Sequence, residues 1–345
     1  METLSVVVPV YNEQEVLPAF YERLAQALST LPCAAEILFV DDGSNDGTAR
    51  ILDDLARRDD RVRVVGLTRN FGHQAALCAG LDVCSGAAVL LIDADLQDPP
   101  ELIRDFHAKW KEGFQVVFGR RRRLEEGFFK RSVYHLFYLA LHWLADIDVP
   151  LDTGDFSLLD RTVVDNLKAL PERTRFLRGL RSWIGLRQTG IEYLRHGRHQ
   201  GQSKYSLTKL FKLAFDGIVS FSTVPLRLAL FMGLAVSAGG FLGIVVVVYL
   251  RLRHSFDLPG WASLMVILLF LGGIQLVTIG IVGEYIARIY EEVKFRPLYL
   301  VARRLGFSAE GAARQAGRDA FERERSTGRR SSPRGGSGTA ADPGT

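Results

Sequence analysis

The chain has 345 residues, which is enough for one sizeable α/β domain and a smaller unit. Its formal net charge of +4 is modest, and the positive residues are clustered along the chain. Its 3 cysteines form no Cys-x-x-Cys pair and have no neighbouring histidine, so we expect no zinc site. We predict that they are buried, reduced thiols, as is typical of a cytosolic domain. An apolar strand pattern begins at Leu4, so we expect no signal peptide.

Apolar runs and helical patterns alternate along the first third of the chain. Strands are predicted at residues 4–10, 36–40, 62–67, 89–92 and 116–118, with helices between them at 15–31, 48–58, 74–85 and 100–112. This alternation predicts a parallel α/β sheet with right-handed crossovers. Polar residues follow nearly every strand, which indicates one shared site at the carboxyl edge of the sheet. A Gly-x-Gly-x-x-Gly or Walker motif does not occur, so dinucleotide-redox and P-loop functions are poorly supported.

Two carboxylates, Asp93 and Asp95, directly follow the strand predicted at 89–92. Because one small residue separates them, both can bind the same hard cation. Mg²⁺ and Mn²⁺ prefer oxygen ligands and usually share them with substrate phosphates. The alternative is a solvated acidic loop, or a helix start capped by Asp98. The polar residues at neighbouring strand ends favour a metal site.

Four motifs in order carry a resemblance to a known family: Val-Val-Pro-Val-Tyr-Asn-Glu, Asp-Asp-Gly-Ser-Asn-Asp-Gly-Thr, Arg-Asn-Phe-Gly-His-Gln-Ala-Ala-Leu and Asp-Ala-Asp-Leu-Gln-Asp-Pro-Pro-Glu. The chain resembles family 2 glycosyltransferases from about residue 4 to residue 295. Within that family it is most similar to polyprenyl-phosphate glycosyltransferases, such as dolichol-phosphate mannose synthases and bactoprenol glucosyltransferases. The resemblance implies a GT-A (Rossmann-like) nucleotide-sugar domain and an inverting transfer that depends on Mg²⁺ or Mn²⁺.

The resemblance also implies roles for individual residues. The nucleotide of a UDP- or GDP-linked sugar would be bound by Pro9, Tyr11, Asn12, Glu13, Asp41, Asp42 and Asp93. The metal and diphosphate would be held by Asp93, Asp95 and Gln97. Asn12 could instead cap a helix. For His73 we see no acidic partner in the sequence and expect a loop-organising or nucleotide-contacting residue.

The second half of the chain contains two uncharged apolar stretches, at residues 228–250 and about 260–283. Each is long enough to cross a hydrocarbon core of roughly 30 Å. Lysines and arginines crowd the outer flanks, so the positive-inside rule predicts a hairpin in the plasma membrane with the catalytic domain and both termini in the cytoplasm. Glycines along both stretches suggest close packing, including a homo-oligomer through these helices.

Two amphipathic stretches, at residues 128–144 and 205–219, mix basic and large apolar side chains. They predict interfacial helices, with ordinary helices packed on the sheet as the alternative. We therefore expect a catalytic domain at 1–204, a juxtamembrane helix at 205–225 and two membrane helices within 226–287. A basic cytoplasmic segment at 288–307 and a disordered tail at 308–345 would complete the chain.

Basic residues cluster in three segments, at residues 120–123, 130–131 and 198–204, which are candidate sites for an anion such as phosphate. Family resemblance assigns the phosphate of the lipid acceptor to Arg121, Arg131 and Arg198, supported by Ser203 and Lys204. The register within residues 120–123 stays open. A nucleic-acid or anionic-lipid patch is the alternative, but the apolar stretches favour a lipid phosphate and no nucleic-acid partner.

Asp155, in Thr-Gly-Asp-Phe, matches the second acidic motif of the family and joins Asp95 as a candidate catalytic residue. A phosphate monoester has a second pKa near ~6 and needs little deprotonation. We therefore expect Asp155 to orient the acceptor, with a general-base role secondary.

The sequence thus predicts a transferase that moves a sugar from a nucleoside-diphosphate sugar to polyprenyl phosphate, for later glycan or cell-envelope assembly. One alternative is a processive polysaccharide synthase, which would carry Gln-x-x-Arg-Trp; residues 181–183 read Arg-Ser-Trp. Another is a silent nucleotide-sugar-binding membrane module, which would not need the acidic and basic residues together.

Overall fold

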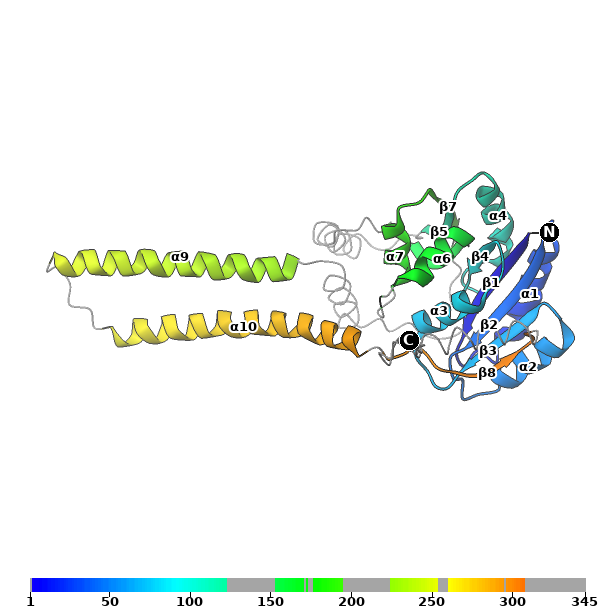
Figure 1. Cartoon of the computed structure of the whole chain (residues 1–345), viewed down its shortest axis with the longest axis horizontal. Coiled ribbons are helices and arrows are strands. Elements are labelled where there is room, and N and C mark those ends of the chain that lie inside the picture. The colour runs from blue at the N-terminus through cyan, green and yellow to red at the C-terminus, as the bar shows by residue number, and fades with distance from the viewer. Residues whose placement is uncertain are drawn as a thin grey trace, which may run out of the picture.

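The computed structural model describes residues 2–122, 153–170, 172, 176–194, 224–253, 260–294 and 296–307. An α/β domain holds most of them, and a pair of long helices projects from it (Figure 1). The amphipathic stretches at 128–144 and 205–219 and the tail at 308–345 lie outside the described residues. So do four of the predicted acceptor residues, namely Arg131, Arg198, Ser203 and Lys204.

The described strands form one 8-stranded sheet in the order β7-β5-β6-β4-β1-β2-β3-β8. Their bounds are Thr3–Val10 (β1), Ala34–Asp41 (β2), Val62–Leu67 (β3), Ala88–Leu91 (β4), Val116–Arg122 (β5), Thr153–Asp160 (β6), Gln188–Leu194 (β7) and Val301–Leu305 (β8). Strands β1 to β4 are parallel, as predicted. The sheet is mixed, however, and not parallel throughout as the sequence pattern suggests, because β6 lies between β4 and β5 and pairs antiparallel with both. Strand β8 also pairs antiparallel, with β3.

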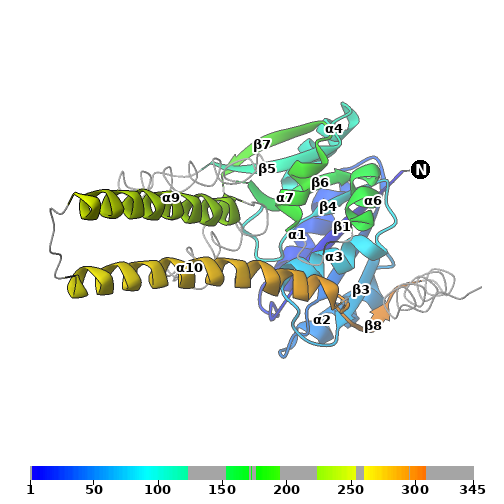
Figure 2. The ribbon, with the colours of Figure 1, turned by 60° about the vertical axis from the view of Figure 1, so that its left-hand side comes forward.

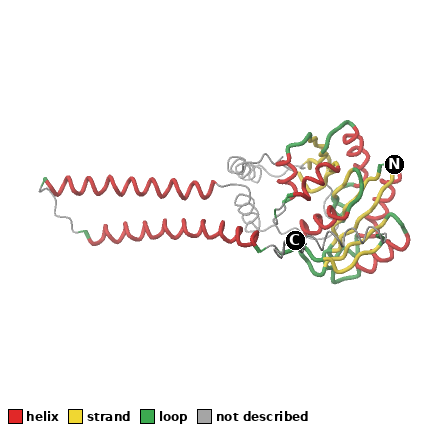
Figure 3. The backbone as a smooth tube through the Cα atoms, viewed as in Figure 1, coloured by secondary structure: helices red, strands yellow, loops and turns green. Residues whose placement is uncertain are grey.

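Helices cover both faces of this sheet (Figures 1 and 3). One face packs against α1 (Leu17–Ser29), α2 (Thr48–Arg58) and α4 (Ile103–Lys111), which follows the short η1 (Pro100–Leu102). The other face packs against α3 (His73–Val83), α6 (Arg161–Ala169) and α7 (Leu177–Ile184). Successive residues of β1 enter opposite cores, with Val6 and Val8 on the α1 side and Val7 on the α3 side. Burial on both faces explains why these strands read as continuous apolar runs.

The long helices are α9 (Val224–Leu252) and α10 (Trp261–Val293), which run side by side away from the sheet (Figures 1 and 2). They contain the spans Leu226–Tyr249 and Val266–Val293, which are long and apolar enough to cross a membrane, judged by length and composition. Large apolar side chains along them are exposed, including Phe231, Phe241 and Leu276. A soluble protein rarely exposes an apolar surface of this extent, which together with the length of the helices favours a membrane-interaction surface.

The glycines of α9 and α10 do not pack the two helices together within this chain. A Cβ atom added at any of them would meet nothing within 4 Å, which holds for Gly233, Gly239, Gly240, Gly243, Gly272, Gly273, Gly280 and Gly283. Their small surfaces are therefore left for lipid or for another subunit.

After α10 the chain returns to the α/β domain and adds β8 at the edge of the sheet beside β3 (Figure 2). The register places Arg303 opposite Gly66 and Leu305 opposite Val64. The sequence predicts a basic segment outside the catalytic domain at residues 288–307. In the structure, residues 301–305 instead complete that domain, because Val301 and Leu305 pack against its two cores.

Candidate active site

A tight turn after β4 presents the first acidic pair at the carboxyl edge of the sheet. Leu96 adopts a positive φ of 59°, which is uncommon for a branched residue and turns the chain sharply. The turn is fixed by Asp95, whose Oδ1 accepts a hydrogen bond of 3.1 Å from the backbone N–H of Gln97. Gln97 itself is 8% exposed. The structure therefore holds Asp93, Asp95 and Gln97 in one short loop.

His73, the first residue of α3, bridges the two acidic motifs. Its Nε2 lies 3.5 Å from Asp93 Oδ1 and 3.3 Å from Asp155 Oδ2. The expectation that His73 has no acidic partner is therefore wrong. Burial lowers the pKa of His73, but Asp155 and Asp93 outweigh this and raise the pKa above its ordinary value. A raised pKa favours the cationic form of His73, which suits a clamp between two carboxylates better than a general base.

Asp155 is contacted by the side chains of His73, Gln74 and Arg178. Arg178 of α7 donates from Nε to Oδ1 at 2.8 Å and from Nη2 to Oδ2 at 3.0 Å. Gln74 donates to Oδ2 at 3.1 Å. Burial alone would raise the pKa of Asp155, but the hydrogen bonds from His73 and Arg178 outweigh it and hold the pKa below its usual range. Asp155 is therefore ionised at any physiological pH.

The acidic cluster fits a divalent cation by its chemistry. Burial raises the pKa of Asp93 to about 6; His73 opposes this shift, while the charges of Asp155, Asp98 and Asp95 reinforce it. A cation beside Asp93 and Asp95 would relieve this crowding. Among the described residues no group of three or more histidine, cysteine or acidic side chains is arranged to hold a metal alone. Two carboxylates would leave the other positions to diphosphate oxygens and water, as Mg²⁺ commonly prefers.

The predicted nucleotide residues lie on two loops that are hydrogen-bonded to each other. Asn12 donates its backbone N–H to Ser44 Oγ at 3.0 Å, and its Oδ1 accepts from Asn45 N at 2.9 Å. Glu13 donates its backbone N–H to Thr48 Oγ1 at 2.9 Å. Asn12 does not cap a helix, because α1 begins at Leu17 with Val16 as its N-cap. The side chain of Asn12 instead joins the loop after β1 to the loop after β2, through its hydrogen bond with Asn45.

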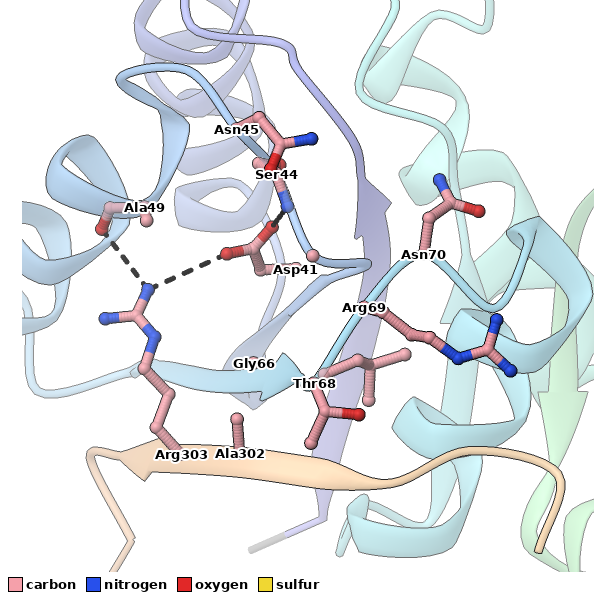
Figure 4. Close-up of a pocket in the computed structure, with 12 residues that line it drawn as sticks. Asp41, Ser44, Asn45, Ala49, Gly66, Thr68, Arg69, Asn70, Ala302 and Arg303 are labelled. Carbon is pink, nitrogen blue, oxygen red and sulfur yellow. Dashed lines mark hydrogen bonds and ion pairs between the residues drawn. The ribbon is translucent and has the colours of Figure 1, made fainter.

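A pocket of about 400 Å³ opens beside these loops (Figure 4). Its lining comes from the ends of β2 and β3, the loops that follow them, the first turn of α2, and β8: Asp41, Gly43, Ser44, Asn45, Ala49, Gly66, Leu67, Thr68, Arg69, Asn70, Ala302 and Arg303. Asp41 is the predicted nucleotide residue in this lining, and its Oδ1 accepts from Ser44 N at 3.0 Å. The lining offers both donors and acceptors, which suits the edge of a nucleobase and the hydroxyls of a ribose.

Three other residues that were predicted to bind the nucleotide, Asp42, Pro9 and Tyr11, are not part of this pocket lining. Asp42 is buried and accepts from the backbone N–H groups of Phe71 at 2.7 Å and Gly72 at 2.9 Å. It therefore organises the loop that leads into α3. Pro9 lies within β1 opposite Val40, and Tyr11 is 41% exposed on the loop that follows.

Arg121 of β5 is the predicted acceptor residue that the structure describes. Its Nε donates to the hydroxyl of Tyr193 at 3.3 Å, and its Nη2 lies 3.8 Å from Asp98 Oδ2. Tyr193 in turn donates to Asp98. A Cβ atom on Gly154 would come within 2.5 Å of Arg121 Nη2, so this guanidinium lies beside the residue that precedes Asp155. Arg121 of β5 and Asp155 of β6 thus lie on neighbouring strands.

Arg181 is a buried cation that the sequence analysis did not assign to the site. It is 3% exposed and lies 5.1 Å from the centre of the Phe118 ring. Burial lowers the pKa of its guanidinium to about 10, so it stays charged at neutral pH. Its Nε and Nη2 have no hydrogen-bond partner among the described residues. Arg178 and Arg181 therefore add two positive charges beside Asp155.

An acidic edge on a mixed α/β sheet, joined to a two-helix apolar hairpin, defines a membrane-associated enzyme of the transferase type. Residues 5–168 match the family model described as Glycosyl transferase family 2, and residues 224–289 match the GtrB C-terminal hairpin. The chain belongs to the family 2 glycosyltransferases and has their GT-A-type fold.

Individual relatives cover nearly the whole chain. An uncharacterized glycosyltransferase, YkcC, of Bacillus subtilis is 48% identical over 303 residues, which is 88% of this chain and 94% of the relative. The SfII prophage-derived bactoprenol glucosyl transferase of Shigella flexneri is 44% identical over 299 residues, 86% of this chain and 97% of the relative. A solved glucosyl-3-phosphoglycerate synthase from Mycobacterium tuberculosis is 21% identical, with a TM-score of 0.45, over 63% of this chain and 78% of that one.

Proposed function

We propose that this glycosyltransferase moves a sugar from a nucleoside-diphosphate sugar to polyprenyl phosphate. The observation that carries the proposal is that Asp93 and Asp155 meet through His73 at the carboxyl edge of the sheet, in a chain that also has two helices long and apolar enough to cross a membrane. The relatives named bactoprenol glucosyl transferase, which match this chain over nearly their whole length, support this acceptor class. Their name makes glucose the first sugar to test.

On the donor side, Asp93, Asp95 and Gln97 would hold a divalent cation, Mg²⁺ or Mn²⁺, together with the diphosphate. When bound, the cation would neutralise the negative charge of the nucleoside diphosphate that departs. The pocket that contains Asp41 would take the nucleoside, which is UDP- or GDP-linked. Pro9, Tyr11, Asn12, Glu13 and Asp42 would line or support it from the adjoining loops.

On the acceptor side, Arg121 would bind the lipid phosphate. Tyr193 and Asp98 restrain its guanidinium, so that little side-chain entropy remains to be lost when the phosphate arrives. Arg131, Arg198, Ser203 and Lys204 are proposed for the same phosphate from outside the described residues. Arginine is suited to this task because its planar fork matches phosphate oxygens.

The reaction would be one in-line displacement at the anomeric carbon of the sugar. An ionised oxygen of the lipid phosphate forms the new bond, the bond to the donor's β-phosphate oxygen breaks, and the nucleoside diphosphate leaves. One displacement inverts an α-linked donor to a β-linked product. The depressed pKa of Asp155 supports an orienting role, because a carboxylate with such low proton affinity is a weak base.

The hairpin would place this site at the inner surface of the plasma membrane, where cytosolic nucleotide-sugars and the headgroup of the lipid meet. Both termini would then be cytoplasmic. The open surfaces of the glycines on α9 and α10 support a homo-oligomer formed through these helices.

A transfer assay tests the function directly. Purified protein in lipid nanodiscs is incubated with polyprenyl phosphate, Mg²⁺ or Mn²⁺, and radiolabelled UDP- or GDP-sugars, and the lipid phase is analysed. We expect one sugar per lipid, attached through phosphate. Label in a polymer would support a processive synthase instead, and nucleotide-sugar binding without transfer of any sugar would support a silent binding module.

A further inference from the structure

Strand β8 brings a charged side chain from beyond the membrane hairpin into the pocket that contains Asp41. Arg303 points from β8 across the edge of the sheet toward Asp41 and the start of α2 (Figure 4). Its Nη2 lies 3.7 Å from Asp41 Oδ2 and 3.4 Å from the carbonyl oxygen of Ala49. Its Nη1 lies 2.5 Å from Asp53 Oδ1, which anchors the guanidinium to α2.

A glycine on the neighbouring strand β3 makes room for the side chain of Arg303. Arg303 lies opposite Gly66 in the register of β3 and β8. A Cβ atom at Gly66 would come within 2.8 Å of Arg303 Cγ and 2.9 Å of its Nε, so only a glycine leaves room for the side chain. Residues 301–305 also lie outside both matched family models, which end at 168 and 289.

Asp41 needs a cationic neighbour of this kind. It is 5% exposed, and a buried carboxylate is costly unless it is hydrogen-bonded and paired. The backbone N–H of Ser44 donates to its Oδ1, while Arg303 faces its Oδ2. The direction of the carboxylate within the pocket is therefore set by one group from the loop after β2 and one from β8.

We infer that Arg303 is a positioning residue for donor recognition: it orients Asp41 toward the nucleobase, so that binding of the nucleoside diphosphate depends on β8 being docked. The inference rests on the proposed function, because it takes this pocket as the nucleoside site. It adds that the chain beyond the membrane hairpin helps to select the donor. The hairpin and the donor pocket are thereby joined through the short segment between α10 and β8.

The test compares variants by calorimetric titration of the full-length protein in nanodiscs with UDP and with GDP. Arg303→Met removes the charge and keeps most of the length. Gly66→Ala keeps the charge and displaces the side chain. Arg304→Met is the matched control, because successive residues of a strand point to opposite faces and Arg304 lies opposite Val65 on the α3 side.

For Arg303→Met and Gly66→Ala we expect the dissociation constant of the preferred nucleotide to rise about tenfold, the size of one charge-assisted contact. The preference between UDP and GDP should narrow, and Arg303→Lys should recover part of the affinity. The KM for the donor sugar should rise by a similar factor. The kcat, the KM for the lipid and the unfolding temperature should stay near their wild-type values. Arg304→Met should bind nucleotide like the wild type.

Wild-type affinity in Arg303→Met would overturn the inference, as would an equal loss in Arg304→Met, which would indicate only that β8 must be intact. A loss of affinity matched by a fall in unfolding temperature and kcat would also overturn it, because Arg303 would then act on the fold as a whole. Failure of the wild-type protein to bind either nucleotide would instead contradict the proposed function.

Discussion

Arg178 and Asp155 form a two-point ion pair across the active site, with Arg178 Nε 2.8 Å from Asp155 Oδ1 and Nη2 3.0 Å from Oδ2. The pair joins α7 to β6, and His73 extends it to Asp93 at the opposite side of the site. A carboxylate fixed by two cations cannot turn freely toward a substrate proton. It can hold those side chains where the proposed acceptor phosphate would arrive. We therefore treat Asp155 as the centre of the acceptor half of the site.

The first prediction concerns Arg178, which should matter for turnover and not for donor binding. Arg178→Lys keeps the charge but loses the two-point geometry, and Arg178→Met loses both. We expect Arg178→Met to lower kcat about tenfold to a hundredfold, the effect of a lost charged hydrogen bond of roughly 1.5–3 kcal/mol. The kcat of Arg178→Lys should lie between that of Arg178→Met and that of the wild type. Steady-state transfer kinetics with calorimetry of nucleotide binding would check this, and equal kcat in all three proteins would contradict it.

The second prediction concerns the metal. Asp95→Asn should nearly abolish transfer, because it removes a ligand from a cation that stabilises the leaving group by several kcal/mol. Circular dichroism should show an unchanged fold, since Asp95 lies on an edge loop and not in either core. Chelation with EDTA should stop the wild-type enzyme, and adding back Mg²⁺ or Mn²⁺ should restore it. Near-wild-type transfer by Asp95→Asn would remove this residue from the metal site.

The third prediction resolves the register of the arginine run. Arg121 is half-buried against Tyr193 and Asp98, whereas Arg120 is exposed. Arg121→Gln should therefore raise the KM for polyprenyl phosphate about tenfold, while Arg120→Gln should leave it near the wild-type value. Tyr193→Phe, which removes only the hydroxyl that restrains Arg121, should change the same KM by a smaller factor. If Arg120→Gln had the larger effect on the KM for the lipid, the acceptor register would have to be shifted by one residue.

The fourth prediction concerns stability at low pH. Arg61 binds Asp59 at 2.8 Å, and the hydroxyl of Tyr21 donates to the same carboxylate at 2.7 Å. Mainly through Arg61, the pKa of Asp59 is lowered to about 2. Because the folded pKa is below the unfolded value near ~3.9, the stabilisation is present above about pH 4 and is lost as pH falls toward 2.

Arg61 is 41% exposed on its side chain, so solvent screening limits the effect to about 1 kcal/mol. Thermal unfolding of Asp59→Asn should show a lower midpoint than the wild type near neutral pH, and the two curves should converge as pH falls toward 2. A difference that stays constant down to that pH would mean that the ion pair does not supply the stabilisation.

The donor half of the site could be predicted from sequence because its residues directly follow strands. Asp41, Asp93 and Asp95 each come at the end of an apolar run, and parallel strands bring such ends to one edge. The partners of His73 could not be found in this way. Asp155 belongs to β6, which is inserted antiparallel between β4 and β5, and no local pattern fixes that order.

Arg178 and Arg303 were missed for a related reason. Arg178 lies in the short amphipathic helix α7, where a charged residue reads as part of the solvated face. Arg303 lies in a five-residue strand whose pattern is too short to stand out and which follows 33 residues of apolar helix. The pairing of β8 with β3, and the packing of Val301 and Leu305 against the two cores, show that this segment belongs to the catalytic domain.

The last prediction concerns topology, on which a cytosolic donor depends. The α/β domain extends from one end of the α9–α10 hairpin, and the helices turn at the other end (Figure 1). If the hairpin spans the membrane, its turn must face away from the compartment that holds the catalytic domain. From the flanking lysines and arginines, the positive-inside rule predicts that this compartment is the cytoplasm.

Cysteine labelling in intact cells tests this arrangement. Cys78 and Cys84 are buried, so replacing the half-buried Cys33 by serine gives a suitable background. Arg253→Cys introduces a thiol at the exposed end of α9, and Arg57→Cys introduces one on α2, where the arginine side chain is 76% exposed. A membrane-impermeant thiol reagent should label the first variant in intact cells and the second only after lysis. Labelling of Arg57→Cys but not Arg253→Cys in intact cells would reverse the topology and exclude a cytosolic nucleotide-sugar as the donor.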